Sequence, residues 1–213
     1  FGHVLGLPDL YDTGYKYYTV SDWSIMCSGN YNNNGRTPPT YSAYERFFLG
    51  WLAPEQLNKK GIYSLEPLQE SNQAYLIANK THNLNGGSPT PSEFFILEYR
   101  TKTGWDTYLP GSGMLVWHID YLASAWYQNT LNDGPDFLRI HLEEANGISW
   151  NQRKNGENGR TSDPYPGTNK VTSFIPKLHD GTVLSDQNVL AITDNNTWLS
   201  FVYQGLGNIK LST

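Results

Sequence analysis

Apolar residues follow two different patterns along the chain, and the change comes near residue 60. Before residue 36, glycine and proline interrupt any long periodic pattern, which predicts a segment made mainly of loops. Between residues 40 and 49 the apolar positions recur at helical spacing, with Thr40 as the expected N-cap and Gly50 just after the end. A helix is therefore predicted over this stretch.

Beyond residue 60 the apolar runs are short and rich in β-branched and aromatic residues, which is typical of strands. Runs such as 94–97 and 114–117 are apolar without alternation, as expected where both faces of a sheet are covered. The predicted strands are 62–65, 74–78, 93–100, 114–121, 137–143, 189–193 and 198–203. The expected fold is α+β with β dominant, in which a turn-and-helix segment, 1–58, packs on a β-rich, sandwich-like module, 59–213.

Composition narrows the classes of function. The 213 residues are 38% hydrophobic, which is enough to fill a core. The net charge is −5 and the sequence has no Lys/Arg cluster, so nucleic acid is not an expected partner. No apolar run approaches the roughly 20 residues that span a bilayer. The single cysteine, Cys27, excludes an internal disulfide framework and is expected to be a small buried hydrophobe rather than a nucleophile.

The most informative residues stand at the start of the chain, where the pattern is His-x-x-Gly-x-x-Asp. In a helical zinc site, two imidazoles lie four residues apart, and a Glu beside the first polarises the zinc-bound water. His3 fits the second of these imidazoles. Gly6 allows a sharp turn through a positive φ, after which Asp9 reaches a third coordination position. On its own, a His before a glycine turn is more often structural.

A second element lies downstream, where residues 22–29 read DWSIMCSG. Met26 stands here in a tight segment flanked by small residues. Its thioether is suited to form an apolar floor beneath zinc ligands without competing for the metal. A methionine is usually a simple core residue. Met26 supports a metal site only because it follows the His3 motif in the correct order.

The two elements, together with later segments, resemble the immune inhibitor A-like family of secreted zinc metalloproteases, which is of the metzincin type. The segments that carry the resemblance are 3–12, 23–29, 42–45, 49–52, 109–120 and 163–167. The resemblance implies zinc as the cofactor, His3 and Asp9 as metal ligands and Met26 as the residue of the Met-turn. It also implies that the lower lobe of a metzincin catalytic domain is represented in residues 1–58.

The family pattern is His-Glu-x-x-His-x-x-Gly-x-x-Asp, in which the first His and the catalytic Glu fall on the two positions before Phe1. No catalytic residue is therefore expected within the chain. The full-length protein is expected to be an endopeptidase that hydrolyses peptide bonds with metal-activated water, and the chain alone is expected to be inactive. The resemblance further implies a protein or peptide substrate, a secreted or cell-surface location and a monomer.

Two alternatives remain open. The first is a module that binds carbohydrate or protein, because the β-rich portion carries many aromatic residues that can stack on sugars. These are Trp105, Tyr108, Trp126, Tyr127, Trp150 and Trp198. The second is a pseudoprotease scaffold whose precursor also lacks the Glu.

Other residues near the motif are weaker candidates for a role in the site. Asp12 is a candidate for supporting the turn or a ligand from the second shell of the metal. Tyr17, Tyr18 and Tyr31 are candidates for stabilising an oxyanion, although aromatic packing is the preferred interpretation.

The remaining histidines and acidic residues allow a second kind of ion site. His118 and Asp120 alternate along a predicted strand and face the same side, so a second metal site is one interpretation, with packing preferred. His82, His141 and His179 have no partner at ligand spacing, and hydrogen-bonded or solvated imidazoles are expected. Glu143-Glu144 and the Asp- and Asn-rich loops make calcium a further candidate ion.

Overall fold

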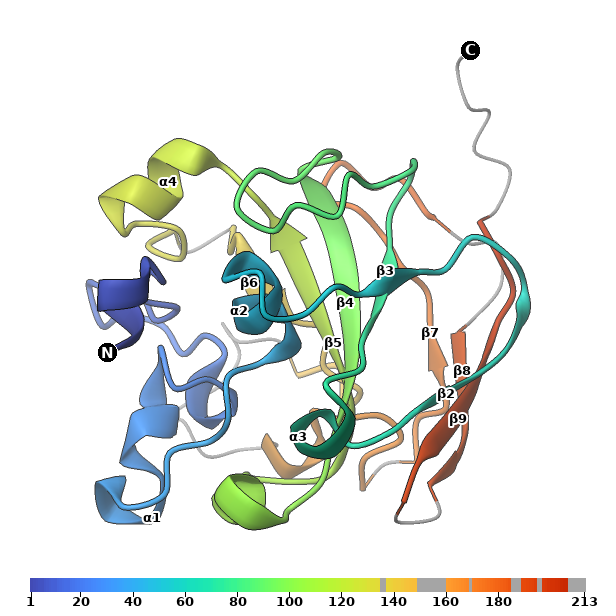
Figure 1. Cartoon of the computed structure of the whole chain (residues 1–213), viewed down its shortest axis with the longest axis horizontal. Coiled ribbons are helices and arrows are strands. Elements are labelled where there is room, and N and C mark those ends of the chain that lie inside the picture. The colour runs from blue at the N-terminus through green and yellow to red at the C-terminus, as the bar shows by residue number, and fades with distance from the viewer. Residues whose placement is uncertain (135–136, 149–159, 169, 185–188, 195–196, 207–213) are drawn as a thin grey trace.

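Two β-sheets and a layer of turns and short helices lie side by side (Figure 1). The structure is a computed structural model that describes residues 1–134, 137–148, 160–168, 170–184, 189–194 and 197–206. The fold is mixed α+β with β dominant, as predicted from the sequence. Every predicted strand is present, and the short strands that were not predicted contain too few residues to show a period of two.

The larger sheet has five strands and the smaller has four. The order in the larger sheet is β1 (Glu55–Gln56), β3 (Tyr75–Ile77), β4 (Glu93–Arg100), β5 (Gly113–Asp120) and β6 (Ile140–Leu142). The order in the smaller sheet is β2 (Gly61–Leu65), β9 (Leu199–Tyr203), β8 (Val189–Asp194) and β7 (Ser173–Phe174). The β1–β3 pair is parallel, and the other pairs between these strands are antiparallel.

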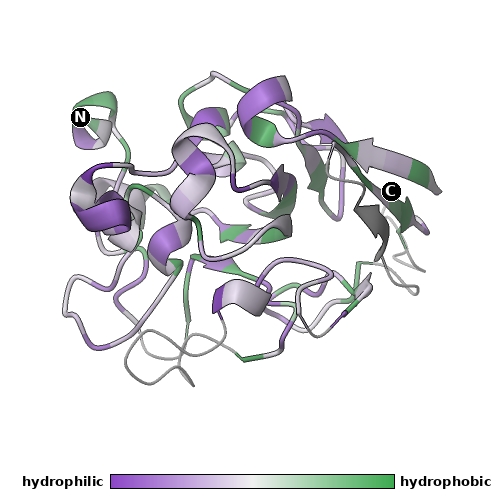
Figure 2. Ribbon diagram, turned by 90° about the horizontal axis from the view of Figure 1, so that it is seen from below, coloured by the Kyte–Doolittle hydropathy of each residue, from purple (hydrophilic) through white to green (hydrophobic). Residues whose placement is uncertain are grey.

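The larger sheet is the middle layer, which explains its continuous apolar runs. Along β4, Phe94 and Ile96 belong to a core shared with the N-terminal turns and helices. Phe95 and Leu97 belong to a second core, shared with the smaller sheet. Successive side chains of a strand point to opposite faces, so a strand covered on both sides is apolar at consecutive positions, as residues 94–97 are. Figure 2 shows hydrophobic residues gathered along these central strands.

The predicted helix is present, but its N-cap is Ser42 rather than Thr40. Helix α2 (Ala43–Phe48) begins with a capping box, in which the Ser42 hydroxyl accepts from the Glu45 amide and the Glu45 carboxylate accepts from the Ser42 amide. Thr40 instead donates its backbone N–H to Asp106, 2.8 Å away. The short helices α1 (Asn32–Gly35), α3 (Leu68–Ser71) and α4 (Ala123–Gln128) were not predicted.

A buried charge network fixes the start of α2 to the larger sheet. The guanidinium of Arg100 binds both oxygens of Asp106 at 2.8 and 2.9 Å and one oxygen of Glu98 at 3.1 Å, and none of the three side chains is exposed. Burial alone would lower the pKa of Arg100, but the two carboxylates outweigh it and the pKa is raised. The second oxygen of Glu98 accepts from the Ala43 amide at 2.5 Å.

Within the described ranges, no helix has both the length and the apolar content needed to cross a membrane. The division at residue 58 stays a prediction. Strand β1 precedes it, and its partner β3 follows it.

Replacing Asp106 with asparagine is expected to lower the free energy of unfolding by about 3 kcal/mol, because it leaves part of the Arg100 charge buried and unpaired. Urea denaturation followed by circular dichroism measures the change. Glu70→Gln, an exposed carboxylate on α3, is the control and should stay within about 0.5 kcal/mol of the wild type. Equal losses in the two variants would show that the network does not stabilise the fold.

Candidate active site

The candidate site begins with a 3₁₀ helix, η1 (Gly2–Leu5), whose position depends on two glycines. Gly2 lies against Met26, and a Cβ placed on Gly2 would stand 2.3 Å from the Met26 sulfur. Gly6 ends the helix in the left-handed region with φ of 94°. The chain can therefore pass closely over Met26 and then turn back, as the sequence motif predicts.

The turn directs His3 and Asp9 toward each other. His3 Nε2 lies 3.0 Å from Asp9 Oδ1, with side chains that are 60% and 13% exposed. The other ring nitrogen, Nδ1, lies 2.9 Å from the carbonyl oxygen of Leu7. Because a carbonyl only accepts, Nδ1 donates a hydrogen bond to Leu7, and Nε2 is the ring nitrogen that faces Asp9.

Asp9 is held from the opposite side by Asn129, a residue that the sequence did not single out. The Asn129 amide donates to Asp9 Oδ2 at 2.7 Å, and its oxygen accepts from the Asp9 backbone N–H at 2.6 Å. Asn129 caps α4 in the left-handed conformation. The cap was a possible signal in the sequence, because asparagine is common there, but nothing local linked it to Asp9 across 120 positions.

Met26 is positioned by a chain of buried hydrogen bonds. The Glu45 carboxylate accepts from the Ser24 hydroxyl at 2.5 Å, and the same hydroxyl oxygen accepts from the Met26 backbone N–H at 2.9 Å. Burial raises the pKa of Glu45, although these hydrogen bonds act in the opposite direction. The Met26 sulfur then packs against Gly2, next to His3.

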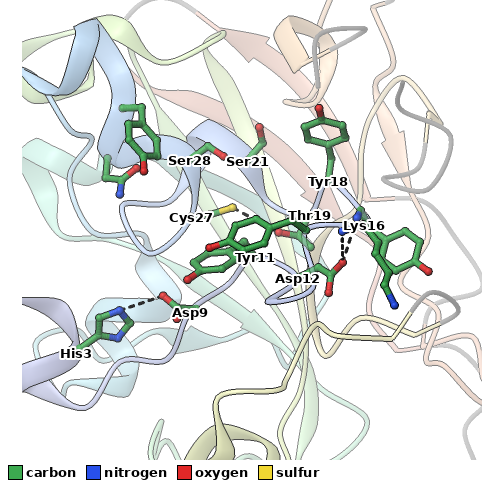
Figure 3. Close-up of a pocket in the computed structure, with 14 residues that line it drawn as sticks. His3, Asp9, Tyr11, Asp12, Lys16, Tyr18, Thr19, Ser21, Cys27 and Ser28 are labelled. Carbon is green, nitrogen blue, oxygen red and sulfur yellow. Dashed lines mark hydrogen bonds and ion pairs between the residues drawn. The ribbon is translucent and has the colours of Figure 1, made fainter. Parts of the chain in front are cut away.

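Two hollows flank the His3–Asp9 pair. The larger, about 610 Å³, contains His3 and Asp9 at one end and Asp12 and Lys16 at the other, with Tyr11 between them (Figure 3). The smaller, about 290 Å³, is lined by both residues of the pair and by Met26. The pair is thus accessible from solvent beside a cleft large enough for a peptide side chain.

Tyr11 lies beside Asp9 and was not singled out by the sequence. Its ring stacks on Tyr15 at 5.5 Å between centroids. Burial, the hydroxyl of Tyr15 and the negative charge of Asp9 raise the pKa of Tyr11, in that order of effect. The phenol therefore remains protonated at neutral pH and can donate a hydrogen bond into the cleft.

Asp12 organises the wall of the cleft. Its buried carboxylate accepts from the backbone N–H groups of Gly14, Lys16 and Tyr17 at 2.6–3.2 Å. These three hydrogen bonds are consistent with Asp12 stabilising a turn, which is one of the two roles considered from the sequence. Tyr17, Tyr18 and Tyr31 line the same cleft.

Cys27 is buried beneath the cleft, and burial raises the pKa of its thiol. It is therefore a small buried residue, as expected from the sequence.

The remaining histidines separate into one core residue and one cluster. His82 is buried, accepts from the Leu84 amide and has its pKa lowered to about 4 by burial. His141 and His179, which have no partner at ligand spacing in the sequence, both lie against His118 at the far face of the larger sheet and contact carboxylates there. Despite burial, the pKa of His118 is raised by hydrogen bonds with Glu143 and Glu93.

Residues 1–52 match the family described as immune inhibitor A peptidase M6, catalytic domain. Over residues 1–52 the chain is therefore similar to immune inhibitor A-like metalloproteases. This segment contains His3, Asp9, Met26 and Glu45. The resemblance noted at 109–120 and 163–167 lies beyond the match and stays a prediction.

The chain is also similar to a pre-pro-metalloprotease, PrtV, of Vibrio cholerae serotype O1, in strain M66-2 and in strain ATCC 39315 / El Tor Inaba N16961. Each shares 41% identity with the chain over 68 residues. The matched segment covers 27% of this chain and 7% of the relative. The chain therefore matches a small part of a much longer protein.

Replacing Glu45 with glutamine is expected to destabilise the fold by about 2 kcal/mol, because an amide has one acceptor oxygen where the carboxylate has two. Urea denaturation measures this loss, and Glu55→Gln on the exposed edge of β1 is the control.

The variant should also move the methyl resonance of Met26 and leave that of Met114, which lies in the other core. A methyl-labelled NMR spectrum distinguishes the two, since the chain has only these two methionines. An unchanged Met26 signal would contradict the coupling between Glu45 and Met26.

Proposed function

We propose that this chain is part of a zinc-dependent endopeptidase, with His3 and Asp9 as two of the protein ligands and Met26 as the apolar floor beneath them. One observation carries the proposal: the imidazole nitrogen and the carboxylate oxygen lie 3.0 Å apart at the edge of a cleft, next to the Met26 thioether. One nitrogen and one oxygen donor suit zinc. A zinc ion held there would supply Lewis-acid polarisation of a peptide carbonyl.

The surrounding residues prepare the two donors. The Leu7 carbonyl keeps the His3 proton on Nδ1, so that Nε2 is free to bind a cation. Asn129 holds Asp9 through both of its side-chain atoms, which limits rotation of the carboxylate. Met26 offers no charge and a weak acceptor, so it shapes the floor without displacing either donor.

We infer further roles for residues before Phe1 from the family motif that the sequence resembles. In the family motif, another His and the general-base Glu occupy the two preceding positions, so the full-length protein supplies the base and the chain alone is inactive. The protein is exported, acts on protein or peptide substrates, and uses residues 1–58 as the lower lobe of its catalytic domain. The family match over residues 1–52 and the cleft beside His3 support a peptide as the substrate.

The aromatic residues that suggested a sugar-binding module do not favour that function. Trp126 is buried, and Trp150 lies outside the described residues. The four exposed members of that set lie on three separate elements. Trp105 and Tyr108 lie on the 3₁₀ helix Gly104–Tyr108, Tyr127 lies on α4, and Trp198 directly precedes β9. A sugar-stacking platform requires them on one surface.

The proposal is tested with a protein extended by its natural upstream residues. It should cleave an unfolded protein such as casein, and chelation should abolish this activity. His3→Ala and Asp9→Asn should each reduce kcat/KM by at least about 100-fold, because each removes a direct ligand. Glu66→Gln, exposed and distant in sequence, is the control. A folded, extended protein without zinc-dependent cleavage would refute the peptidase, and an upstream sequence without Glu would favour the pseudoprotease.

Asn129→Gly is expected to weaken zinc binding by the extended protein about 10- to 100-fold, because glycine keeps the left-handed backbone but removes both bonds to Asp9. Activity should recover at high zinc. Asn72→Gly, which changes another left-handed asparagine at the end of α3, is the matched control. Equal zinc affinities in the two variants would show that Asn129 does not position Asp9.

A further inference from the structure

A second group of potential metal ligands lies on the far face of the larger sheet, at the end where β4 begins. The sheet register places Glu93 opposite Asp120 and His118 opposite His141. His118 and Asp120 are two positions apart on β5, so both face the smaller sheet. The register therefore brings residues from three strands to one place.

Carboxylates connect the rings at this place. His118 Nδ1 lies 2.8 Å from Glu143 Oε1, and His118 Nε2 lies 2.9 Å from Glu93 Oε1. His141 Nε2 lies 3.3 Å from the same oxygen of Glu143. Glu143 thus bridges two of the rings, and Glu93 holds the other side of His118.

The third imidazole comes from a turn that follows β7. The ring of His179 stacks on that of His118, with centroids 4.3 Å apart and an angle of 16°. Its Nδ1 lies 3.4 Å from both Glu93 and Asp120, and its backbone N–H donates to Glu93 at 2.6 Å. The turn is therefore attached to the larger sheet through the cluster.

The burial and charge of the cluster suit a cation. The side chain of His118 is 2% exposed, whereas those of His141 and His179 are 17% and 22% exposed, so the cluster opens to solvent on one side. The cluster contains three carboxylates, those of Glu93, Asp120 and Glu143. One guanidinium, that of Arg139, lies 3.5 Å from Asp120. With neutral imidazoles, these contacting groups leave an excess of two negative charges.

We propose that His118, His141 and His179 bind a divalent transition-metal cation of the zinc class, with the carboxylates of Glu93 and Glu143 placed to supply oxygen. One ligand atom from each of the three imidazoles lies within 4.8 Å of the others. Zinc bound at about 2.1 Å holds tetrahedral ligands roughly 3.4 Å apart, so the ligand atoms need to approach one another by at most about 1.4 Å. Imidazole nitrogen favours zinc, nickel or copper over calcium, which requires an all-oxygen shell.

This site is independent of the candidate active site, because it shares no residue with His3, Asp9 and Met26 and lies on the other face of the sheet. Its metal would join strands β4, β5 and β6 of the larger sheet to the turn after β7 of the smaller one. We therefore expect the cation to stabilise the packing of the two sheets.

The test uses the 213-residue chain carrying His3→Ala, so that binding at the N-terminal motif does not contribute. After chelation and dialysis, isothermal titration should show one equivalent of Zn²⁺ bound, and Co²⁺ should give the intense visible bands of a four-coordinate ion. Adding His179→Gln or His141→Gln should raise the Kd for Zn²⁺ by at least about 100-fold. Zinc should raise the melting temperature of the His3→Ala chain and leave that of the His3→Ala/His179→Gln chain unchanged.

Melting curves without metal show whether each variant is folded. His179 lies on a turn, so its variant decides the matter alone if His141→Gln does not fold. The proposal is overturned if the His3→Ala chain binds no Zn²⁺, if it binds Ca²⁺ only, or if folded His179→Gln binds Zn²⁺ with unchanged affinity. These experiments measure metal binding and melting temperature, not peptidase activity. The proposal for the His118 cluster therefore stands even if the peptidase proposal fails.

Discussion

The buried carboxylate of Glu45 joins the pieces of chain that form the candidate active site. It caps α2 through Ser42, and it accepts from Ser24, whose oxygen in turn holds the Met26 amide. Taking a carboxylate out of water is costly, and burial raises its pKa, but each oxygen has a donor at hydrogen-bond distance. One side chain thus couples the direction of a helix to the position of a sulfur atom.

The helix is itself fixed to a rigid layer. The Ala43 amide binds Glu98, which is paired with Arg100 and lies in a strand buried on both faces. A displacement of α2 would expose these charges to an apolar core, so the position of Met26 is determined by the larger sheet as well as by its own turn. The Met26 sulfur then sets how closely Gly2 approaches, and thereby where His3 begins.

Features that depend on neighbouring residues could be predicted from the sequence. The strands were found because their apolar runs are local, and His3 and Asp9 were found because six positions and one glycine bring them together. The sequence predicted Thr40 as the N-cap of α2, because Thr40 has a suitable side chain at the right place. Its actual partner, Asp106, is 66 positions away, so no local pattern could reveal that contact. Asn129 escaped notice for the same reason, since only the folded chain brings it to Asp9.

The His118 cluster illustrates this limit most clearly. Alternation along β5 correctly placed His118 and Asp120 on one face, but the identity of the residues opposite them depends on register. A shift of one residue between β5 and β6 would point His141 to the other face of the sheet, away from His118. The His3–Asp9 contact forms within one short segment and needs only the turn at Gly6. The His118 cluster forms only when the strands and the turn after β7 are assembled. Metal binding at the cluster would therefore depend on assembly of the two sheets, while the His3 motif depends on η1 and the Met26 segment.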